Sequence, residues 1–284
     1  MNVPMPPGLK DLAKAGLTKV ADKFVDFVIT KYTGKSIKVF EAEGDIEADK
    51  VKTKWEALEK PFWLQAEAEK MNRQYSNFGN TLLKASPLIT STENKIEDDN
   101  DFFWGLVEHS KEISNAEMQE LIAKIIAGEY NAPGAYSMST LQVVKMLDKN
   151  SLELFEKICS LLINEYTLPH ILFSGKYNSE SFMKSNEIDF KKLQALQSIG
   201  LFLPNQMSHI IDNPENKNYG VQYFDKMLIY SPENEGETKV QPPDFYGLSP
   251  VGEQILTHLS PTYIEDYYLW LKTNYKIRRY KLVE

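Results

Sequence analysis

The chain has little cysteine and little histidine. Its 284 residues include one cysteine, Cys159, and four histidines. A single cysteine excludes an internal disulfide and every multi-cysteine zinc or iron–sulfur site. His109, His170, His209 and His258 do not stand at the spacings of metal ligands. We therefore expect no metal site and no cofactor.

Catalytic sequence motifs are also missing. The chain has no dinucleotide-binding glycine pattern, no GxSxG nucleophile elbow and no HExxH pair. Residues 33–36 (TGKS) resemble the end of a phosphate-binding loop, but Ile29 stands where that loop needs a glycine. Cys159 lies between Phe155 and Leu162 on an apolar helical stripe, which indicates a buried hydrophobe rather than a nucleophile. We expect no enzymatic activity and no catalytic residue.

Long apolar runs are absent from the sequence. A membrane-spanning helix needs about 18 or more consecutive apolar residues, and no run approaches that length. Lys10, Asp11 and Lys14 interrupt the region in which a signal peptide would have its apolar core. These features predict a cytoplasmic protein.

Positive charge is scarce as well. The chain has 32 Lys and Arg against 40 Asp and Glu, a net charge of −8. Residues 150–260 contain 8 lysines, no arginine and 14 acidic residues. Because nucleic-acid binding needs cations in excess on one face, we do not expect nucleic acid as a partner. The basic run 276–281 (KIRRYK), with Arg278 and Arg279, is compatible with a solvated tail, a strand against the domain or an anion contact.

The sequence does contain enough apolar residues for a globular core. Hydrophobic residues make up 42% and charged residues 25%, which is typical of a globular protein. From residue 9 to residue 31, apolar side chains that include Phe24 and Phe27 recur every three or four positions, the period of one helical face. This face either packs on the protein's own core or lies on a membrane or in a partner's groove. Asp22 and Asp26 weaken the membrane alternative.

Residues 40–101 predict a long helix followed by a linker. The segment 40–75 is rich in Glu, Ala and Lys, and Pro61 would kink or divide its helix. A solvated helix, a linking arm and an oligomerisation helix share this composition. Residues 86–101 carry proline, serine and an acidic stretch without the spacing of a calcium loop, and we expect a linker there.

The centre of the chain predicts three short helices. Each begins at a polar residue that can cap it, followed three positions later by Glu or Gln. The expected pairs are Ser114 with Glu117, Ser139 with Gln142, and Asn150 with Glu153. The third helix is expected to span residues 152–166.

Beyond residue 169 the pattern predicts a winged-helix-like region. Asp189 can cap a helix over 189–199, and two strands, 221–230 and 239–248, would flank a turn at 231–238. Ser249 and Ser260, each followed by proline, would begin two further helices. The predicted fold is therefore mainly α: N-terminal helices, a central three-helix unit and a winged-helix-like C-terminal region with a small two-stranded ribbon. The expected divisions are residues 1–90, 91–168 and 169–284, the last sharing helix 152–166.

Residues 113–159 resemble the core of an uncharacterised bacterial family, a domain of unknown function. The pieces LQALQSIGLF and LSPVGEQIL resemble its C-terminal part, so the likeness covers about residues 100–260. The abortive-infection alpha group of phage-defence proteins is similar more distantly. The resemblance implies a setting in bacterial defence or stress response, and no activity is carried over from it. The matching positions are Ala127, Gly128, Glu129, Pro133, Gly134 and Ser137.

Most of these matching positions predict a helix–helix connection. Gly128, Pro133 and Gly134 are residues that shape turns, and Ser137 or Ser139 can cap the next helix. Glu129 and Tyr130 could instead form a small recognition surface.

We therefore expect a non-catalytic protein-interaction or sensing module in bacterial anti-phage defence or stress response, with a protein partner or a homo-oligomer. The alternatives are an abortive-infection effector that contacts a membrane peripherally through helix 9–31 and a winged-helix nucleic-acid binder. The candidate interaction residues are Phe24, Phe27, Glu129, Tyr130, Arg278 and Arg279.

Overall fold

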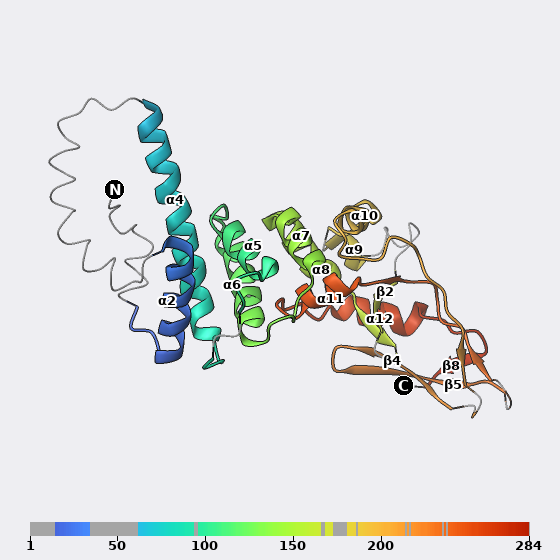
Figure 1. The fold of residues 1–284 in the computed structure, drawn as a ribbon. Coiled ribbons are helices and arrows are strands. Elements are labelled where there is room, and N and C mark those ends of the chain that lie inside the picture. The colour runs from blue at the N-terminus through green and yellow to red at the C-terminus, as the bar shows by residue number, and fades with distance from the viewer. Residues whose placement is uncertain are drawn as a thin grey trace, which may run out of the picture. The chain divides into compact units, whose positions relative to one another are not determined.

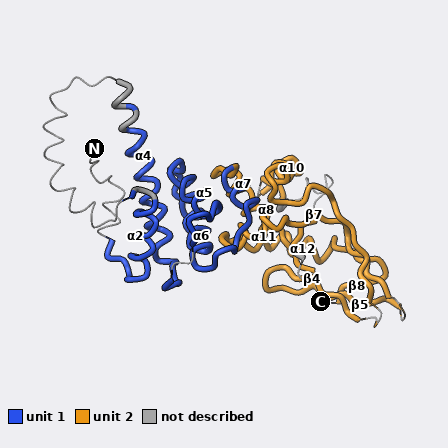
Figure 2. Tube along the Cα trace, viewed as in Figure 1, with its two compact units in different colours: residues 1–145 blue, residues 146–284 orange. Residues whose placement is uncertain are grey.

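A computed structural model describes residues 15–34, 62–93, 96–165, 168–172, 181–185, 187–213, 215, 217–234, 236 and 238–283. Contacts between residues divide the chain into two compact units, residues 1–145 and 146–284 (Figure 2). Each unit has a core of its own. The sequence-based divisions at residues 90 and 168 remain a prediction.

The described part of unit 1 is helical. Its central helix, α6, packs against both α4 and α5, and its Ile122, Ile125 and Ile126 side chains are fully buried. The elements are α2 (Lys19–Thr33), α4 (Phe62–Ala85), the short 3-10 helix η1 (Ser86–Leu88), α5 (Asp101–Ser110), α6 (Ala116–Asn131) and α7 (Met138–Met146), which ends at the boundary of the unit (Figure 1).

The amphipathic segment expected at 9–31 forms α2. Thr18 caps its start through a hydrogen bond from the Ala21 amide, and Gly34 ends it in the left-handed conformation at φ 74°. The apolar face of α2 is buried within unit 1, because Phe24 and Val28 have no exposed surface. Of the expected segment, residues 9–14 lie outside the described residues, as do residues 35–61. The helix α4 begins directly after Pro61.

The expected cap pairs of the three central helices are wrong by one or two residues. Asp148 rather than Asn150 caps α8 (Lys149–Cys159), and at α7 the alternative Ser137, rather than Ser139, accepts from the Thr140 amide. The side chain of Asn115, rather than Ser114, caps α6 and accepts from the amides of Glu117 and Met118. The Ser114 hydroxyl instead accepts a hydrogen bond of 3.1 Å from the Asn77 side chain of α4. Asparagine caps a helix as well as serine does, so the sequence allowed both registers.

Unit 2 combines helices with strands. The described elements are α8 (Lys149–Cys159), β1 (Ile163–Glu165), β2 (Leu168–Ile171), α9 (Ser181–Ser185), α10 (Phe190–Ser198), β3 (Ile211–Asp212), β4 (Tyr219–Tyr223), β5 (Lys226–Pro232), β6 (Lys239–Val240), β7 (Tyr246–Gly247), α11 (Pro250–Leu256), α12 (Glu265–Asn274) and β8 (Tyr280–Leu282).

The predicted mainly α fold with a winged-helix-like region and a two-stranded ribbon is wrong. Six strands of unit 2 form an antiparallel sheet in the order β7-β2-β1-β4-β5-β8, and β3 pairs with β6 in a second, small sheet. The chain is therefore a mixture of α and β structure. The basic run at the C-terminus supplies the edge strand β8, which was one of its three expected placements.

Two misread turns explain this error. The helix expected over 152–166 ends at Cys159, and the chain turns into the hairpin β1–β2. The run 221–230, expected to be one strand, contains the β4–β5 hairpin, which turns at Phe224 and Asp225. The first position of a two-residue hairpin loop favours glycine, asparagine or aspartate, so Phe224 there gave no turn signal.

Several C-terminal helices were predicted more accurately. Asp189 caps α10, whose Leu193 and Leu196 are buried, and Ser249 caps α11 with Pro250 in its first turn. The helix expected to start at Ser260 begins later, at Glu265. Helix α12 packs on the buried face of the large sheet, because the ring centroids of Tyr267 and Tyr223 are 5.2 Å apart.

Candidate functional site

A buried carboxylate with two histidines lies within unit 2. Glu165 ends β1 and His170 lies diagonally across the β1–β2 hairpin, where Ile163 pairs with His170 and Glu165 with Leu168. His209 lies two residues after Met207, which exchanges two backbone hydrogen bonds with Phe245, the residue directly before β7. We call Glu165, His170, His209 and Tyr219 the carboxylate–histidine cluster.

The carboxylate of Glu165 joins the members of this cluster. Its Oε2 atom accepts a 2.5 Å hydrogen bond from the Tyr219 hydroxyl and lies 3.4 Å from Nε2 of His209. Its Oε1 atom lies 3.5 Å from Nε2 of His170. The side chains of Glu165 and His170 are 1% and 0% exposed, whereas that of His209 is 27% exposed. Burial, with repulsion from the Glu165 carboxylate, raises the pKa of neighbouring Tyr230.

The cluster has part of the geometry of an acid–base dyad. Hydrolases use a carboxylate to orient an imidazole that in turn activates a nucleophile. Within the described part of the chain, Nδ1 of His209 is buried and has no hydrogen-bond partner, so no nucleophile is bound to it there. Among the same residues, no group of three or more His, Cys, Asp or Glu side chains could hold a metal ion. The contact of His209 with Glu165 and the backbone bonds between Met207 and Phe245 hold the segment around His209 to the sheet.

An aromatic surface lies at the turn of the β4–β5 hairpin. The Phe224 ring is 5.8 Å from that of Tyr263, and the Tyr263 ring is 6.1 Å from that of Tyr268 in α12. Phe224 is 37% exposed, and both tyrosines are half-buried. Beneath them Tyr223 is fully buried and donates to the Ser160 carbonyl oxygen. We call Phe224, Tyr263 and Tyr268 the aromatic face.

Phe224 adopts a backbone conformation that phenylalanine rarely takes. Its φ is 52°, in the left-handed region that favours glycine, asparagine and aspartate. The position is the first residue of a two-residue hairpin loop, because Tyr223 pairs with Lys226. A bulky residue at such an angle costs on the order of 1–3 kcal/mol, and such strained residues cluster at functional sites.

The aromatic face has a negative electrostatic environment. The Tyr263 hydroxyl donates a 2.7 Å hydrogen bond to Glu265, and burial together with Glu265 raises the pKa of Tyr263. Burial, with the same carboxylate, raises the pKa of Tyr223 to about 12, against a backbone hydrogen bond from Ile264 that lowers it. The Lys272 ammonium lies 5.3 Å from the centre of the Tyr268 ring, so this face already accommodates one cation.

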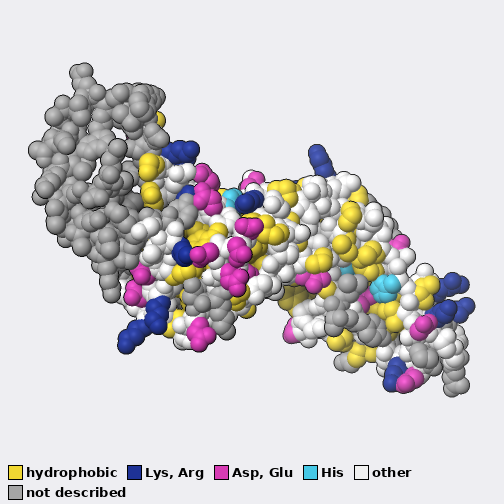
Figure 3. Space-filling model, viewed as in Figure 1, with side chains coloured by type: hydrophobic (Ala, Val, Ile, Leu, Met, Phe, Trp, Pro, Cys, Tyr) yellow, Lys and Arg dark blue, Asp and Glu magenta, His cyan; other side chains and the backbone are white. Residues whose placement is uncertain are grey.

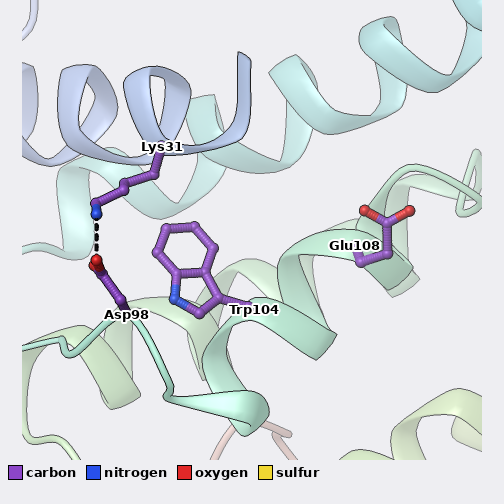
Figure 4. Close-up of a pocket in the computed structure, with 4 residues that line it drawn as sticks. All are labelled: Lys31, Asp98, Trp104 and Glu108. Carbon is purple, nitrogen blue, oxygen red and sulfur yellow. Dashed lines mark hydrogen bonds and ion pairs between the residues drawn. The ribbon is translucent and has the colours of Figure 1, made fainter. Parts of the chain in front are cut away.

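A hollow of about 450 Å³ in unit 1 is lined by Lys31, Asp98, Trp104 and Glu108. Figure 4 shows the Trp104 indole between the Lys31–Asp98 pair and Glu108. Lys31 and Asp98 are 2.6 Å apart, and Lys111 pairs with Glu108. The charges around this hollow are therefore already balanced within unit 1.

The structure brings three of the predicted interaction residues together inside unit 1. The Phe24 and Tyr130 rings are 4.7 Å apart in an edge-to-face arrangement, and the Phe27 ring lies 6.3 Å from Tyr130. Phe24 is fully buried, Tyr130 is 3% exposed and Phe27 is half-buried. Phe24 and Tyr130 thus belong to the core of unit 1.

Glu129 is also buried, and it organises the turn that follows α6. Its carboxylate accepts hydrogen bonds from the amides of Gly134 and Tyr136 and from the Asn100 side chain. Gly134 itself adopts a φ of 86°. These contacts give Glu129, Pro133 and Gly134 a role in shaping the turn.

The remaining predicted residues, Arg278 and Arg279, are exposed in the turn that precedes β8. Figure 3 shows Lys and Arg side chains gathered on the side of unit 2 that carries β8 in Figure 1. Arg279 has a φ of 64°, and its carbonyl oxygen accepts from the Glu233 amide. We call Arg278 and Arg279 the arginine end.

Sequence reasoning missed both the carboxylate–histidine cluster and the aromatic face. Glu165 and His170 are only five positions apart, on paired strands, so a hairpin prediction there could have placed them together. Tyr219, however, lies 54 positions from Glu165. Phe224 gave no signal because its strained conformation is visible only in three dimensions.

One family model matches the chain. It is described as a protein of unknown function, DUF2806, and it matches residues 65–272. The match extends through both compact units and includes Gly128, Glu129, the carboxylate–histidine cluster and the aromatic face. No curated protein and no solved structure matches the chain.

Proposed function

This chain belongs to the DUF2806 family of proteins of unknown function, and we propose that it is a non-catalytic protein-interaction module that binds its partner through the aromatic face of unit 2. The observation that carries the proposal is Phe224, an exposed aromatic side chain held at a φ of 52° in a hairpin turn. Glycine or asparagine would relieve this strain. The ring packs on Tyr223 and Tyr263, with centroids 4.9 and 5.8 Å away, and we assign its exposed part to the contact with the partner.

The composition of the face supports a protein partner. Aromatic residues are enriched at the energetic centres of protein interfaces, where they bring large apolar area at low entropic cost. Phe224, Tyr263 and Tyr268 provide such a centre. Tyrosines with an apolar ring and a polar hydroxyl suit a surface that is wet when unbound.

A membrane partner finds less support in this structure. Binding through helix 9–31 would require the apolar face of α2, but Phe24 and Val28 of that face are buried within unit 1. The helix would have to leave unit 1 and expose that face to water. Among the described residues, no helix is long and apolar enough to cross a bilayer.

A nucleic-acid partner would use the same rings differently, because aromatic side chains also stack on bases. Such sites combine stacking with a positively charged groove. Here Glu265 and Asp266 accompany the face, and Glu265 is bonded to Tyr263. This charge favours protein over a polyanion.

The proposed setting is bacterial defence or stress response. It is supported by the resemblance of residues 113–159 to a bacterial family with distant likeness to abortive-infection proteins. It predicts that phages form fewer plaques on cells that express the chain. A variant that lacks the Phe224 ring should not give this protection.

The interaction proposal is tested by capture with two matched baits. The full-length protein and a Phe224→Asn variant are immobilised, exposed to a nuclease-treated lysate of bacteria that also express the untagged natural chain, and analysed by mass spectrometry. Asparagine tolerates positive φ, so the hairpin should stay folded while the ring is lost. We expect a defined protein to be retained by the natural chain and lost by the variant. Its purified form should bind Phe224→Asn about tenfold or more weakly.

A control variant separates the face from general surface change. Leu269→Gln alters an exposed apolar residue on α12 outside the aromatic face and should retain the same partner. Equal capture by Phe224→Asn would contradict the proposal, and so would the absence of any protein that the natural chain retains and the variant loses.

A further inference from the structure

We propose that the partner of the aromatic face is a second copy of this chain, which inserts its arginine end, so that copies associate head to tail. The inference rests on the proposed function, because it names the occupant of the face proposed there. It begins from two exposed, strained residues of complementary chemistry in the same unit. Phe224 has a φ of 52° and Arg279 a φ of 64°.

The chemistry of the two surfaces matches. A guanidinium group is attracted to the face of an aromatic ring and pairs with carboxylates in a planar, directed way. The aromatic face offers the rings of Phe224 and Tyr268 together with the Glu265 carboxylate. The position of the Lys272 ammonium over Tyr268 shows that a cation is accepted on this surface.

The arginine end provides the matching cations. Arg278 and Arg279 are adjacent and exposed in the turn that precedes β8. They are two of the three arginines in the sequence, the other being Arg73. Arginine is less strongly hydrated than lysine and is the cation that protein interfaces favour.

The two surfaces of one copy cannot meet. Strand β5 runs from Lys226, next to the Phe224 turn, to Pro232, which pairs with Tyr280 beside Arg279. Its seven residues separate the two surfaces by about 20 Å at the usual rise per strand residue. In Figure 1 the turn between β4 and β5 lies at one end of the hairpin, and the part of β5 beside β8 lies toward the other end. A contact between an arginine end and an aromatic face is therefore a contact between two molecules.

This arrangement makes the contact heterologous, since each copy contributes a different surface to each interface. Heterologous contacts build a ring if the rotation closes and an open chain if it does not. Each copy inside the assembly would use both surfaces, and the terminal copies of an open chain would use one.

The test measures the size of the full-length protein by sedimentation velocity over a range of concentrations. We expect the natural chain to form species larger than dimers and to dissociate in high salt, because the interface contains charge pairs. Phe224→Asn lacks the aromatic face, and the double variant Arg278→Gln with Arg279→Gly lacks the arginine end. Each alone should self-associate about tenfold or more weakly. Both replacements at positive φ suit the backbone, and circular dichroism checks folding.

Mixing the two variants gives the decisive result. Phe224→Asn keeps an intact arginine end and the arginine double variant keeps an intact aromatic face, so together they can form one interface. The equimolar mixture should contain dimers and nothing larger. Leu269→Gln should assemble as the natural chain does.

Three results would overturn the inference: a natural chain that stays monomeric at every concentration, variants that assemble as it does, or a mixture that stays monomeric. A monomeric natural chain with Phe224-dependent capture of a different protein would overturn self-association and leave the proposed function standing. If self-association did not depend on Phe224 and both baits captured the same proteins equally, the proposed function and the self-association would both be overturned.

Discussion

The Tyr219 hydroxyl donates a 2.5 Å hydrogen bond to Oε2 of Glu165 inside unit 2. The two residues lie on neighbouring strands, β4 and β1, and on the buried face of the sheet. Both are almost completely buried. A carboxylate in that position requires polar partners, because burying an unpaired charge is costly. Tyr219, His170 and His209 are the partners that surround it.

Replacing Glu165 with leucine should therefore destabilise unit 2. The apolar side chain would leave the Tyr219 hydroxyl without its acceptor and would remove the contacts to both histidines. We expect the free energy of unfolding to fall by about 1–3 kcal/mol, the usual cost of leaving a buried donor without its acceptor. Glu165→Gln keeps one acceptor oxygen and should lose less. Urea unfolding followed by circular dichroism measures both, and equal stability of all three proteins would contradict this role.

The Tyr219→Phe variant isolates the hydrogen bond from the rest of the cluster. It removes the hydroxyl and keeps the ring in the core. The expected loss is about 1–3 kcal/mol, because one oxygen of a buried carboxylate loses a donor. In the Glu165→Leu background the same change should have little further effect. An undiminished loss in that background would show that Tyr219 acts through other contacts.

Unit 1 should lose stability in acid because of His109. Burial lowers the pKa of this imidazole in α5, Lys145 lowers it further, and Glu112 opposes both. The unfolded chain then binds more protons than the folded one below the ordinary histidine pKa. The stability that His109 contributes is therefore present above about pH 6.5 and is lost as the pH falls through the lower folded pKa.

A His109→Gln variant tests this directly. Its free energy of unfolding should fall less than that of the natural chain between about pH 7 and about pH 5, the range in which histidines change charge. Changing Lys145 to Gln should reduce the acid loss in part, since it removes the second cause. Parallel pH profiles for the natural chain and His109→Gln would assign the acid sensitivity to other groups.

Much of the helical structure could be predicted because it depends on local signals. The caps Asp189 and Ser249 were correct, and both lie directly before an apolar periodic segment. Cys159 was expected to be a buried hydrophobe, and it is 1% exposed with its thiol pKa raised by burial and by Glu156. Such features depend on the residues within one or two turns.

The sheet could not be predicted because its strands are short and some paired strands, such as β1 and β4, are distant in sequence. β1 has three residues, and its neighbours in the sheet are β2 and β4. A three-residue segment is too short to show an alternating pattern, so Ile163 and Glu165 were read as the end of a helix. The same distance hid the carboxylate–histidine cluster, whose members come from β1, β2, β4 and the segment before β3.

Removing the Glu129 carboxylate should loosen the turn after α6. Glu129→Ala would remove the charged acceptor of the Gly134 and Tyr136 amides. We expect a loss of about 1–3 kcal/mol in the free energy of unfolding and faster amide hydrogen exchange at both residues. Glu129→Gln keeps an acceptor oxygen and should preserve the slow exchange. Unchanged exchange in Glu129→Ala would contradict the role assigned to this carboxylate.

Gly128 should tolerate alanine only when the Tyr136 ring is absent. An added Cβ at Gly128 would lie 2.5 Å from the Tyr136 hydroxyl oxygen. The ring cannot move easily because it stacks on Phe102, with centroids 5.7 Å apart and an interplanar angle of 8°. In the natural background, Gly128→Ala should therefore lower the free energy of unfolding by about 1–3 kcal/mol through overpacking. In a Tyr136→Ala background the clash is gone, and alanine should raise that free energy by up to about 1 kcal/mol because it favours the helix more than glycine does. A double-mutant cycle by urea unfolding measures this change of sign, and the same sign in both backgrounds would show that Tyr136 is not the reason for glycine at position 128.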